Sequence, residues 1–364
     1  MPTTSNPSDW ALPHVRELHP YTPGEQPDET NWIKLNTNEN PYPPSPRVAE
    51  AVDAALAGLQ RYPEPRSDAL RKGIAEYHKV AENRIFVGNG SDEVLNLLVR
   101  AFCGAGRPVG TTDPSYSLYP VLAAIQNAEL VRVAFDRDMK LDPSLIASSG
   151  SSLFFLTSPN APTGVGFARD GLERLLDLFP GLLVVDEAYA AFADEDAIPL
   201  LGSYRHLAIS RTLSKSHGLA GLRVGYLLAD PSVVQVLDRI RDSYNVNRLS
   251  QAGALAALLD RGYYRETVAR IVATRDLCMG KFHALGWFTY PSQANFIFTE
   301  PVSAQGARGA AVARDLEGFL RDHRILVRYF AGSRLTERFL RISVGTESEM
   351  EALFGEIDLW RMTA

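Results

Sequence analysis

The chain has 364 residues, of which 45% are hydrophobic and 22% are charged, and its formal net charge is −6. This length predicts about two domains and a core large enough to be stable without a disulfide or metal staple. The acidic balance argues against a general nucleic-acid binder, which needs a basic excess.

The sequence also argues against disulfide-rich, metal-binding and membrane proteins. Cys103 and Cys278 are too few for a disulfide framework and too far apart for a CxxC metal site. We expect both to be buried like small apolar residues, and no bound metal. No run approaches the roughly 18 apolar residues of a membrane helix, and residues 1–26 lack the apolar core of a signal peptide. We therefore expect a cytoplasmic protein.

Residues 1–46 contain ten prolines and little periodicity. Because proline fixes φ and removes a backbone donor, they are predicted to form an extended arm that lies on another surface. In residues 47–242, short apolar runs alternate with helical patterns, which predicts a large domain with a mostly parallel sheet covered by helices. The predicted strands are Ile85–Val87, Leu130–Val133, Leu153–Leu156, Leu182–Val185 and Leu207–Ile209, and the predicted helices are Asp92–Cys103 (capped by Ser91), Tyr116–Asn127 and Ala168–Phe179.

Residues 243–364 are predicted to form a smaller α+β domain. Thr346 and Glu349 have the spacing of a capping box and predict the start of the last helix. The other predicted elements of this half are helices over Pro231–Ser243, Leu249–Leu285 and Ala310–Arg321 and strands over Phe296–Phe298, Ile325–Arg328 and Phe339–Val344.

The most informative motif is the segment 210–225, which follows an apolar strand. It holds a single lysine, Lys215, among hydroxyls and glycines, and Arg223 follows eight residues later. Lys215 is either a solvated loop residue or a lysine that holds an aldehyde cofactor as a Schiff base beside a phosphate site. The surrounding hydroxyls and Arg223 favour the second interpretation.

A second motif begins at the end of a purely aliphatic strand, where Asp186 is followed by Tyr189. This is the edge of the sheet at which open α/β proteins bind ligands. Asp186 is either a helix cap or the partner of a pyridinium nitrogen. Tyr189 is either a wall residue or a contact of the cofactor ring.

Three loops complete the pattern. The segment 86–93 reads as a strand, a glycine turn and a helix start, whose N–H groups suit a phosphate. The segment 113–119 offers Tyr116 for stacking on a flat cofactor, and the segment 158–164 forms a tight turn. Each loop alone is common in α/β proteins, so the prediction of a cofactor site depends on the order of all five motifs.

In this order the motifs resemble the fold-type I pyridoxal-phosphate aminotransferases over essentially the whole chain. The segments 38–42, 61–64, 90–93 and 214–215 are most similar to those of the histidinol-phosphate aminotransferase family. The resemblance implies the α/β fold of that family and pyridoxal 5'-phosphate as cofactor. It also implies transamination from L-histidinol phosphate to 2-oxoglutarate, a step of histidine biosynthesis.

The resemblance also implies roles for individual residues. Lys215 would hold the cofactor and move the reacting proton, while Asp186 would bind the pyridine nitrogen and Tyr189 the ring oxygen. The remaining cofactor contacts would be Tyr116 on the ring face and Ser91, Asp92, Thr212, Ser214 and Arg223 at the phosphate, with Tyr62 reaching the cofactor phosphate of the other subunit in an obligatory homodimer.

The chain departs from the family at Ala161, where many relatives carry the asparagine that bonds the ring oxygen. Asn160 is the neighbouring candidate for this contact. If its amide is not aimed at the ring, Tyr189 bonds the oxygen alone.

The substrate contacts are predicted from two strand arginines, Arg328 and Arg341. Arg341 lies in an otherwise apolar strand, where burial without an anion would be costly. The alternative is a solvated strand face. By the resemblance, both arginines take the substrate phosphate and Arg341 also takes the 2-oxoglutarate carboxylate. Tyr21 would close over the substrate and Asn38 would line the entrance.

Three other functions remain open. An aromatic amino acid aminotransferase and a threonine-phosphate decarboxylase have the same fold, and the sequence does not show which bond at the α-carbon breaks. A non-catalytic regulator built on this fold would need a basic DNA-binding segment. The 46-residue arm has no helix-turn-helix pattern, so this alternative is disfavoured.

Overall fold

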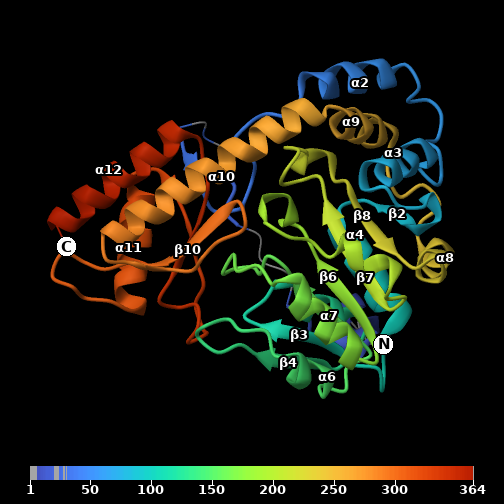
Figure 1. Cartoon of the computed structure of the whole chain (residues 1–364), viewed down its shortest axis with the longest axis horizontal. Helices are drawn as coiled ribbons and strands as arrows, with labels where there is room; N and C mark the ends of the chain where they lie inside the picture. The colour runs from blue at the N-terminus through green and yellow to red at the C-terminus, as the bar shows by residue number, and fades with distance from the viewer. Residues whose placement is uncertain (1–5, 20–23, 28, 30, 364) are drawn as a thin grey trace, which may run out of the picture.

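The computed structural model describes residues 6–19, 24–27, 29 and 31–363. Two regions are visible in Figure 1, a large sheet with its helices and a smaller group around β10, and the long helix α10 runs between them. The arrangement confirms a doubly covered α/β fold with a smaller α+β part.

The large region is built on a seven-stranded sheet in the order β2-β8-β7-β6-β5-β3-β4. β8 alone runs opposite to the other six strands, so the sheet is mostly parallel as predicted. Two strands were not predicted, β3 and β8. The bounds are β2 (Ile85–Gly88), β3 (Val109–Asp113), β4 (Leu130–Ala134), β5 (Leu153–Thr157), β6 (Leu182–Asp186), β7 (Leu207–Thr212) and β8 (Gly225–Ala229).

Both faces of this sheet are buried. Along β5, Phe154 and Leu156 belong to one apolar cluster, whereas Leu153 and Phe155 belong to another on the opposite face. The apolar run therefore serves two cores, which explains the missing polar alternation. The helices of this region are α2 (Pro46–Leu56), α3 (Asp68–His78), α4 (Ser91–Phe102), α5 (Leu118–Ile125), α6 (Pro143–Ala147), α7 (Arg169–Leu178) and α8 (Pro231–Ile240).

The start of α4 differs from the prediction that Ser91 caps it. The helix begins at Ser91 itself, and the N-cap is Gly90, which has no side chain to accept a capping hydrogen bond. Gly90 has φ +83°, and a Cβ atom there would meet the Arg223 guanidinium at 2.6 Å. Glycine is therefore needed at the cap because the backbone is left-handed and the arginine passes close by.

The smaller region contains an antiparallel sheet in the order β12-β13-β10-β9 and its own apolar core. The predicted strand over Ile325–Arg328 divides into two, because β11 pairs with the arm and β12 with β13. The capping box is confirmed, since Thr346 N–H donates to Glu349 Oε2 (2.7 Å) and Glu349 N–H to Thr346 Oγ1 (3.3 Å). The elements are β9 (Phe288–Thr289), β10 (Phe296–Glu300), α11 (Ala310–Asp322), β11 (Ile325–Leu326), β12 (Arg328–Tyr329), β13 (Leu340–Ser343) and α12 (Glu347–Thr363).

The predicted helix over Leu249–Leu285 is two helices, α9 (Arg248–Leu259) and α10 (Arg261–Ala284). Asp260 separates them and caps α10 through a bond from Tyr263 N–H to its carboxylate (3.3 Å). α9 packs against α2 and α3 and shares the core of the large sheet. By core membership, α9 therefore lies with the large region, although the predicted boundary at residue 243 assigns it to the small domain.

The arm contacts both regions of the same chain. Its strand β1 (Ile33–Lys34) pairs in parallel with β11, and Leu35 joins the small core. Nearer the N-terminus, a short helix of the arm, α1 (Pro13–Arg16), contacts α5 of the large region.

Both cysteines are free and buried, as expected. Burial raises the pKa of Cys103 to about 12 and that of Cys278 to about 11. Within the described residues, no helix has the length and apolar character needed to cross a bilayer. The same residues contain no group of three or more side chains able to hold a metal ion.

Candidate active site

A cavity of about 270 Å³ lies where the arm, the carboxyl edge of the large sheet and the small sheet meet. Most of the predicted site residues line it. They are Asn38, Ser91, Asp92, Tyr116, Asp186, Tyr189, Thr212, Ser214, Lys215, Arg223, Arg328 and Arg341.

Asp186 ends β6 and lies at the floor of this cavity. Its Oδ2 accepts a hydrogen bond from the buried phenol of Tyr119 (2.8 Å), whereas its buried Oδ1 has no hydrogen-bond partner among the described residues. Burial raises the pKa of Asp186 to about 6, and the bonds from Tyr119 and, to a smaller extent, from the backbone amide of Ala188 oppose this shift. The carboxylate is thus held on one side and has one oxygen left for a donor in the cavity.

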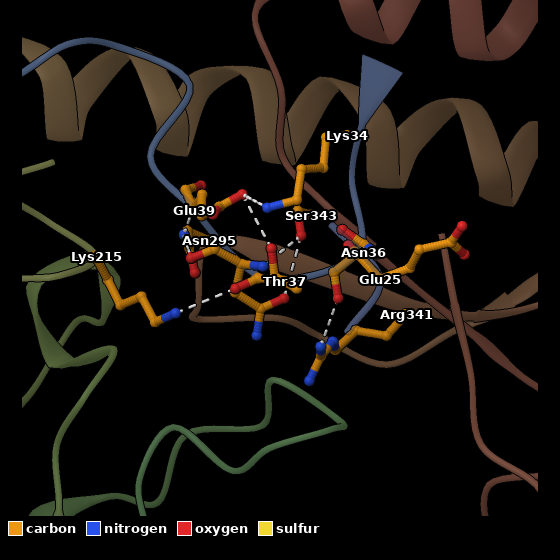
Figure 2. Close-up of polar contacts among 10 residues, drawn as sticks. Glu25, Lys34, Asn36, Thr37, Glu39, Lys215, Asn295, Arg341 and Ser343 are labelled. Carbon is orange, nitrogen blue, oxygen red and sulfur yellow. Dashed lines mark hydrogen bonds and ion pairs between the residues drawn. The ribbon is translucent and has the colours of Figure 1, made fainter. Parts of the chain in front are cut away.

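Lys215 follows β7 and faces the arm. Its Nζ donates to the carbonyl oxygen of Thr37 (3.1 Å), as Figure 2 shows. Burial lowers the pKa of Lys215 to about 8, and the nearby Arg341 acts in the same direction. A sizeable share of the amine is therefore neutral near pH 8, as a nucleophile or general base must be.

Five predicted phosphate contacts lie together beside Lys215. Arg223 pairs with Asp92 (3.1 Å), and Thr212 Oγ1 donates to Ser214 Oγ (2.9 Å). A Cβ atom at Gly225 would lie 2.2 Å from Ser91 N, so only glycine lets β8 pass this close to the start of α4. Two amides of a helix N-terminus, two hydroxyls and a guanidinium thus form an anion-binding set.

Tyr189 and Asn38 meet on the small-domain side of the cavity. The Asn38 amide Nδ2 donates to Tyr189 Oη (3.0 Å), and the Tyr189 ring packs edge-on against Phe296 with centroids 5.0 Å apart. Asn38 is itself anchored, because its backbone N–H donates to Ser343 Oγ (2.8 Å). The arm therefore supplies part of the site and is not only a brace.

Arg328 and Arg341 are direct cross-strand partners on β12 and β13. Both line the cavity, and their guanidinium carbons lie 5.7 and 5.2 Å from the centre of the Phe330 ring. Arg341 also donates to the carbonyl oxygen of Asn36 (2.9 Å), as Figure 2 shows. Like charges placed directly opposite each other destabilise a sheet, so the pair forms a cationic site suited to an anion.

Three predicted residues are not placed in the cavity. Asn160 is buried, and its amide donates to the Pro114 carbonyl (3.1 Å) and accepts from Thr163 Oγ1 (2.8 Å). These bonds hold its own turn, and Asn160 is not among the residues that line the cavity, whereas Ala161 is. Tyr62 is 76% exposed and stacks on Tyr244 with centroids 4.5 Å apart. Tyr21 lies outside the described residues.

Sequence reasoning missed several residues of the site. Thr37, Thr157 and Phe330 line the cavity, and Tyr119 lies behind Asp186. Tyr119 stands three residues after Tyr116 within the predicted helix Tyr116–Asn127, and this spacing was the available signal, although α5 begins only at Leu118. Thr37 and Phe330 carried none, because their places depend on contacts with distant parts of the chain.

Comparisons with known proteins agree with this geometry. Residues 30–357 match the family described as aminotransferase class I and II. Histidinol-phosphate aminotransferases from Geotalea uraniireducens and Geobacter sulfurreducens are 44% and 43% identical, each over 93% of this chain and 95% and 96% of their own. The Sinorhizobium meliloti histidinol-phosphate aminotransferase, solved in complex with pyridoxal-5'-phosphate, superposes with a TM-score of 0.84 at 28% identity, covering 91% of this chain and 92% of its own.

Proposed function

Because the chain belongs to the class I and II aminotransferases and, within them, to the histidinol-phosphate aminotransferase family, we propose that it transfers the amino group of L-histidinol phosphate to 2-oxoglutarate. The products are imidazole acetol phosphate and L-glutamate, in histidine biosynthesis. The enzyme is a transaminase, and its cofactor is pyridoxal 5'-phosphate.

The residues of the large-sheet side fit this cofactor. The buried Oδ1 of Asp186 lacks a partner among the described residues, and a protonated ring nitrogen would supply one. Lys215 would hold the aldehyde carbon, and Tyr189 would contact the ring oxygen. Tyr116 would cover the ring face, and the phosphate would be held by the amides of Ser91 and Asp92 together with Thr212, Ser214 and Arg223.

Two side chains handle charge and protons during the reaction. When bound, the cofactor supplies an electron sink for the electron pair left on the substrate's α-carbon. Lys215 Nζ takes the proton from that carbon, for which its lowered pKa of about 8 suits it. Asp186 stays ionised above its pKa of about 6 and keeps a positive charge opposite Oδ1.

The observation that carries the choice of substrate is the cross-strand pair of Arg328 and Arg341. A phosphate dianion has enough oxygens to bond both guanidinium groups. Arg341 alone would take a carboxylate of 2-oxoglutarate in the second half-reaction. Asn38 would line the entrance to this site, and Tyr21 would close over the substrate.

A panel of amines distinguishes this proposal from its rivals. Absorbance of the lysine-bound cofactor should be lost with histidinol phosphate at a far higher kcat/KM than with phenylalanine or threonine phosphate. A preference for phenylalanine would identify an aromatic amino acid aminotransferase. Release of carbon dioxide from threonine phosphate would identify the decarboxylase, which the arginine pair also fits.

We further propose a homodimer in which Tyr62 reaches the cofactor phosphate of the partner subunit. In one chain Tyr62 is largely exposed, and its carbonyl oxygen accepts from Arg248 (2.8 Å), which fixes the loop at the surface. Leu56 and Leu59 nearby are also exposed in the single chain, as expected for a face that a partner subunit would cover. Sedimentation should give a dimer, and an active monomer would contradict this assembly.

We propose a cytoplasmic location for the enzyme. Its two free cysteines are compatible with a reducing compartment. Fractionation of cells that produce the protein should recover the activity with other cytoplasmic enzymes, and recovery from the periplasm or the membrane would contradict the proposal.

A further inference from the structure

The phenol of Tyr119 lies directly behind Asp186. Its Oη is 2.8 Å from Asp186 Oδ2 and 2.7 Å from Thr157 Oγ1. We propose that Tyr119 is a positioning residue that holds Oδ2 and thereby presents Oδ1 to the ring nitrogen of the cofactor. The inference rests on the proposed function, because it takes Asp186 as the partner of that nitrogen.

The surroundings of Tyr119 fix the position of its hydroxyl. The residue is fully buried in the first turn of α5. Its ring stacks on Phe155 with centroids 4.5 Å apart and an interplanar angle of 8°, and it meets the Tyr116 ring edge-on at 5.6 Å. The phenol therefore cannot swing away from the carboxylate, and the same packing connects it to the predicted stacking residue.

The hydroxyls behind Asp186 form a chain with one direction. Ser115 Oγ lies 3.4 Å from Thr157 Oγ1, which is next to Tyr119 Oη. An ionised carboxylate only accepts, and each hydroxyl has one proton to donate. Ser115 therefore donates to Thr157, Thr157 to Tyr119, and Tyr119 to Asp186. This series of hydrogen bonds ends on Oδ2 and leaves Oδ1 facing the cavity.

Backbone pairing supports this arrangement. Thr157 and Asp186 are register partners at the ends of β5 and β6. Burial and the neighbouring carboxylate raise the pKa of Tyr119, so the phenol keeps its proton and remains a donor. Loss of this donor should make Asp186 easier to protonate, because burial, Asp92 and Glu187 all disfavour the charged form and only the backbone amide of Ala188 would still favour it among the main influences on its pKa.

The pH dependence of cofactor binding reports on this bond. Other groups around Asp186 also carry charge or titrate. They are Asp92, Glu187 and Tyr119 next to it, and Tyr189, Lys215 and Arg223 across the cavity. The Tyr119→Phe substitution leaves all of them except the phenol unchanged, so a difference between variant and wild type isolates the hydroxyl.

The experiment measures the Kd for pyridoxal 5'-phosphate from pH 5 to 9 on cofactor-free protein. In Tyr119→Phe we expect binding at pH 7 to weaken roughly tenfold, the effect of one lost charged hydrogen bond. The pH below which binding weakens should rise by about one unit. Tyr290→Phe is the matched control, because it removes a buried phenol that bonds the Arg137 carbonyl outside the cavity. We expect no change in its pH profile.

Two further variants keep the test decisive if Tyr119→Phe does not fold. Thr157→Val removes the hydroxyl that donates to Tyr119 and should shift the profile in the same direction by less, whereas Thr157→Ser should restore it. A profile and a Kd unchanged in both Tyr119→Phe and Thr157→Val would overturn the inference. Failure of the wild type to bind the cofactor would instead overturn the proposed function.

Discussion

The two walls of the cavity differ in how they are built and in the charge they present. One wall, the sheet wall, consists of Thr157, Asp186, Thr212 and Lys215, which end or follow neighbouring strands of the large sheet. The other, the arginine wall, consists of Arg328, Phe330 and Arg341 on and beside two short antiparallel strands.

We expect the two walls to have different roles, with the sheet wall binding the cofactor and the arginine wall binding the substrate. The sheet wall offers a buried carboxylate and a lysine of lowered pKa, which suit a cationic ring and proton transfer. The arginine wall offers two paired cations, which suit an anionic substrate. Changes in the sheet wall should therefore affect every substrate, and changes in the arginine wall should affect the choice among substrates.

The largest effect should come from Lys215→Ala. Turnover should fall by roughly three orders of magnitude or more with any amine, because the covalent anchor and the general base are both lost. Stopped-flow or steady-state kcat measures this, and Lys140→Ala, at an exposed lysine, should keep full activity. Borohydride should fix the cofactor on the peptide that contains Lys215, and labelling at another lysine would contradict the assignment.

Asp186→Asn should stabilise the cofactor-free protein near neutral pH. The folded pKa of Asp186 is raised from 3.8 to about 6, so its ionisation costs stability as pH rises through this window, and asparagine avoids that cost. The free energies of unfolding should be similar at pH 4. At pH 7 they should differ by up to about 3 kcal/mol in favour of the variant. Asp138→Asn, at an exposed aspartate, is the control, and an equal difference at both pH values would contradict the account.

Arg341→Ala should impair both half-reactions. We propose that the guanidinium binds the substrate phosphate and the 2-oxoglutarate carboxylate. Its loss should raise the activation free energy for each substrate by about 1.5–3 kcal/mol, which lowers each kcat/KM roughly ten- to hundredfold. Single-turnover kinetics with each substrate separates the two effects. An unchanged 2-oxoglutarate reaction would remove Arg341 from the acceptor site.

Thr346→Ala should lower stability without affecting selectivity. It removes the side-chain half of the capping box at the start of α12, which should cost about 1 kcal/mol. Thermal unfolding measures the loss. The ratio of kcat/KM values for histidinol phosphate and phenylalanine should stay constant, and a changed ratio would show that selectivity follows stability rather than the arginine wall.

The sheet wall was largely predictable from the sequence because each of its parts is local. An apolar strand followed by a polar loop marks the ligand edge of a parallel sheet. This pattern predicted Asp186, Lys215 and the proposed phosphate contacts, all of which line the cavity. It failed where polar residues occupy a buried strand, as in β3 with its Gly-Thr-Thr sequence. It also failed at Tyr119, whose helical position looks like that of an ordinary core residue.

The arginine wall was predictable only in part. The apolar setting of Arg341 pointed to a functional anion contact, but the pairing of β12 with β13 and the place of Phe330 depend on tertiary structure. The same holds for the bond from Arg341 to Asn36, which joins residues 305 positions apart. For Asn160, sequence proximity could not show that the side-chain amide bonds Pro114 and Thr163.

The division between the walls is tested most directly by Arg328→Ala. We expect kcat/KM for histidinol phosphate to fall roughly ten- to hundredfold, as for a lost charged hydrogen bond, while kcat/KM for phenylalanine stays near its wild-type value. Arg132→Ala, at an exposed strand arginine of the large sheet, should change neither. A wild-type preference for phenylalanine, or an equal loss with both substrates in Arg328→Ala, would contradict the account.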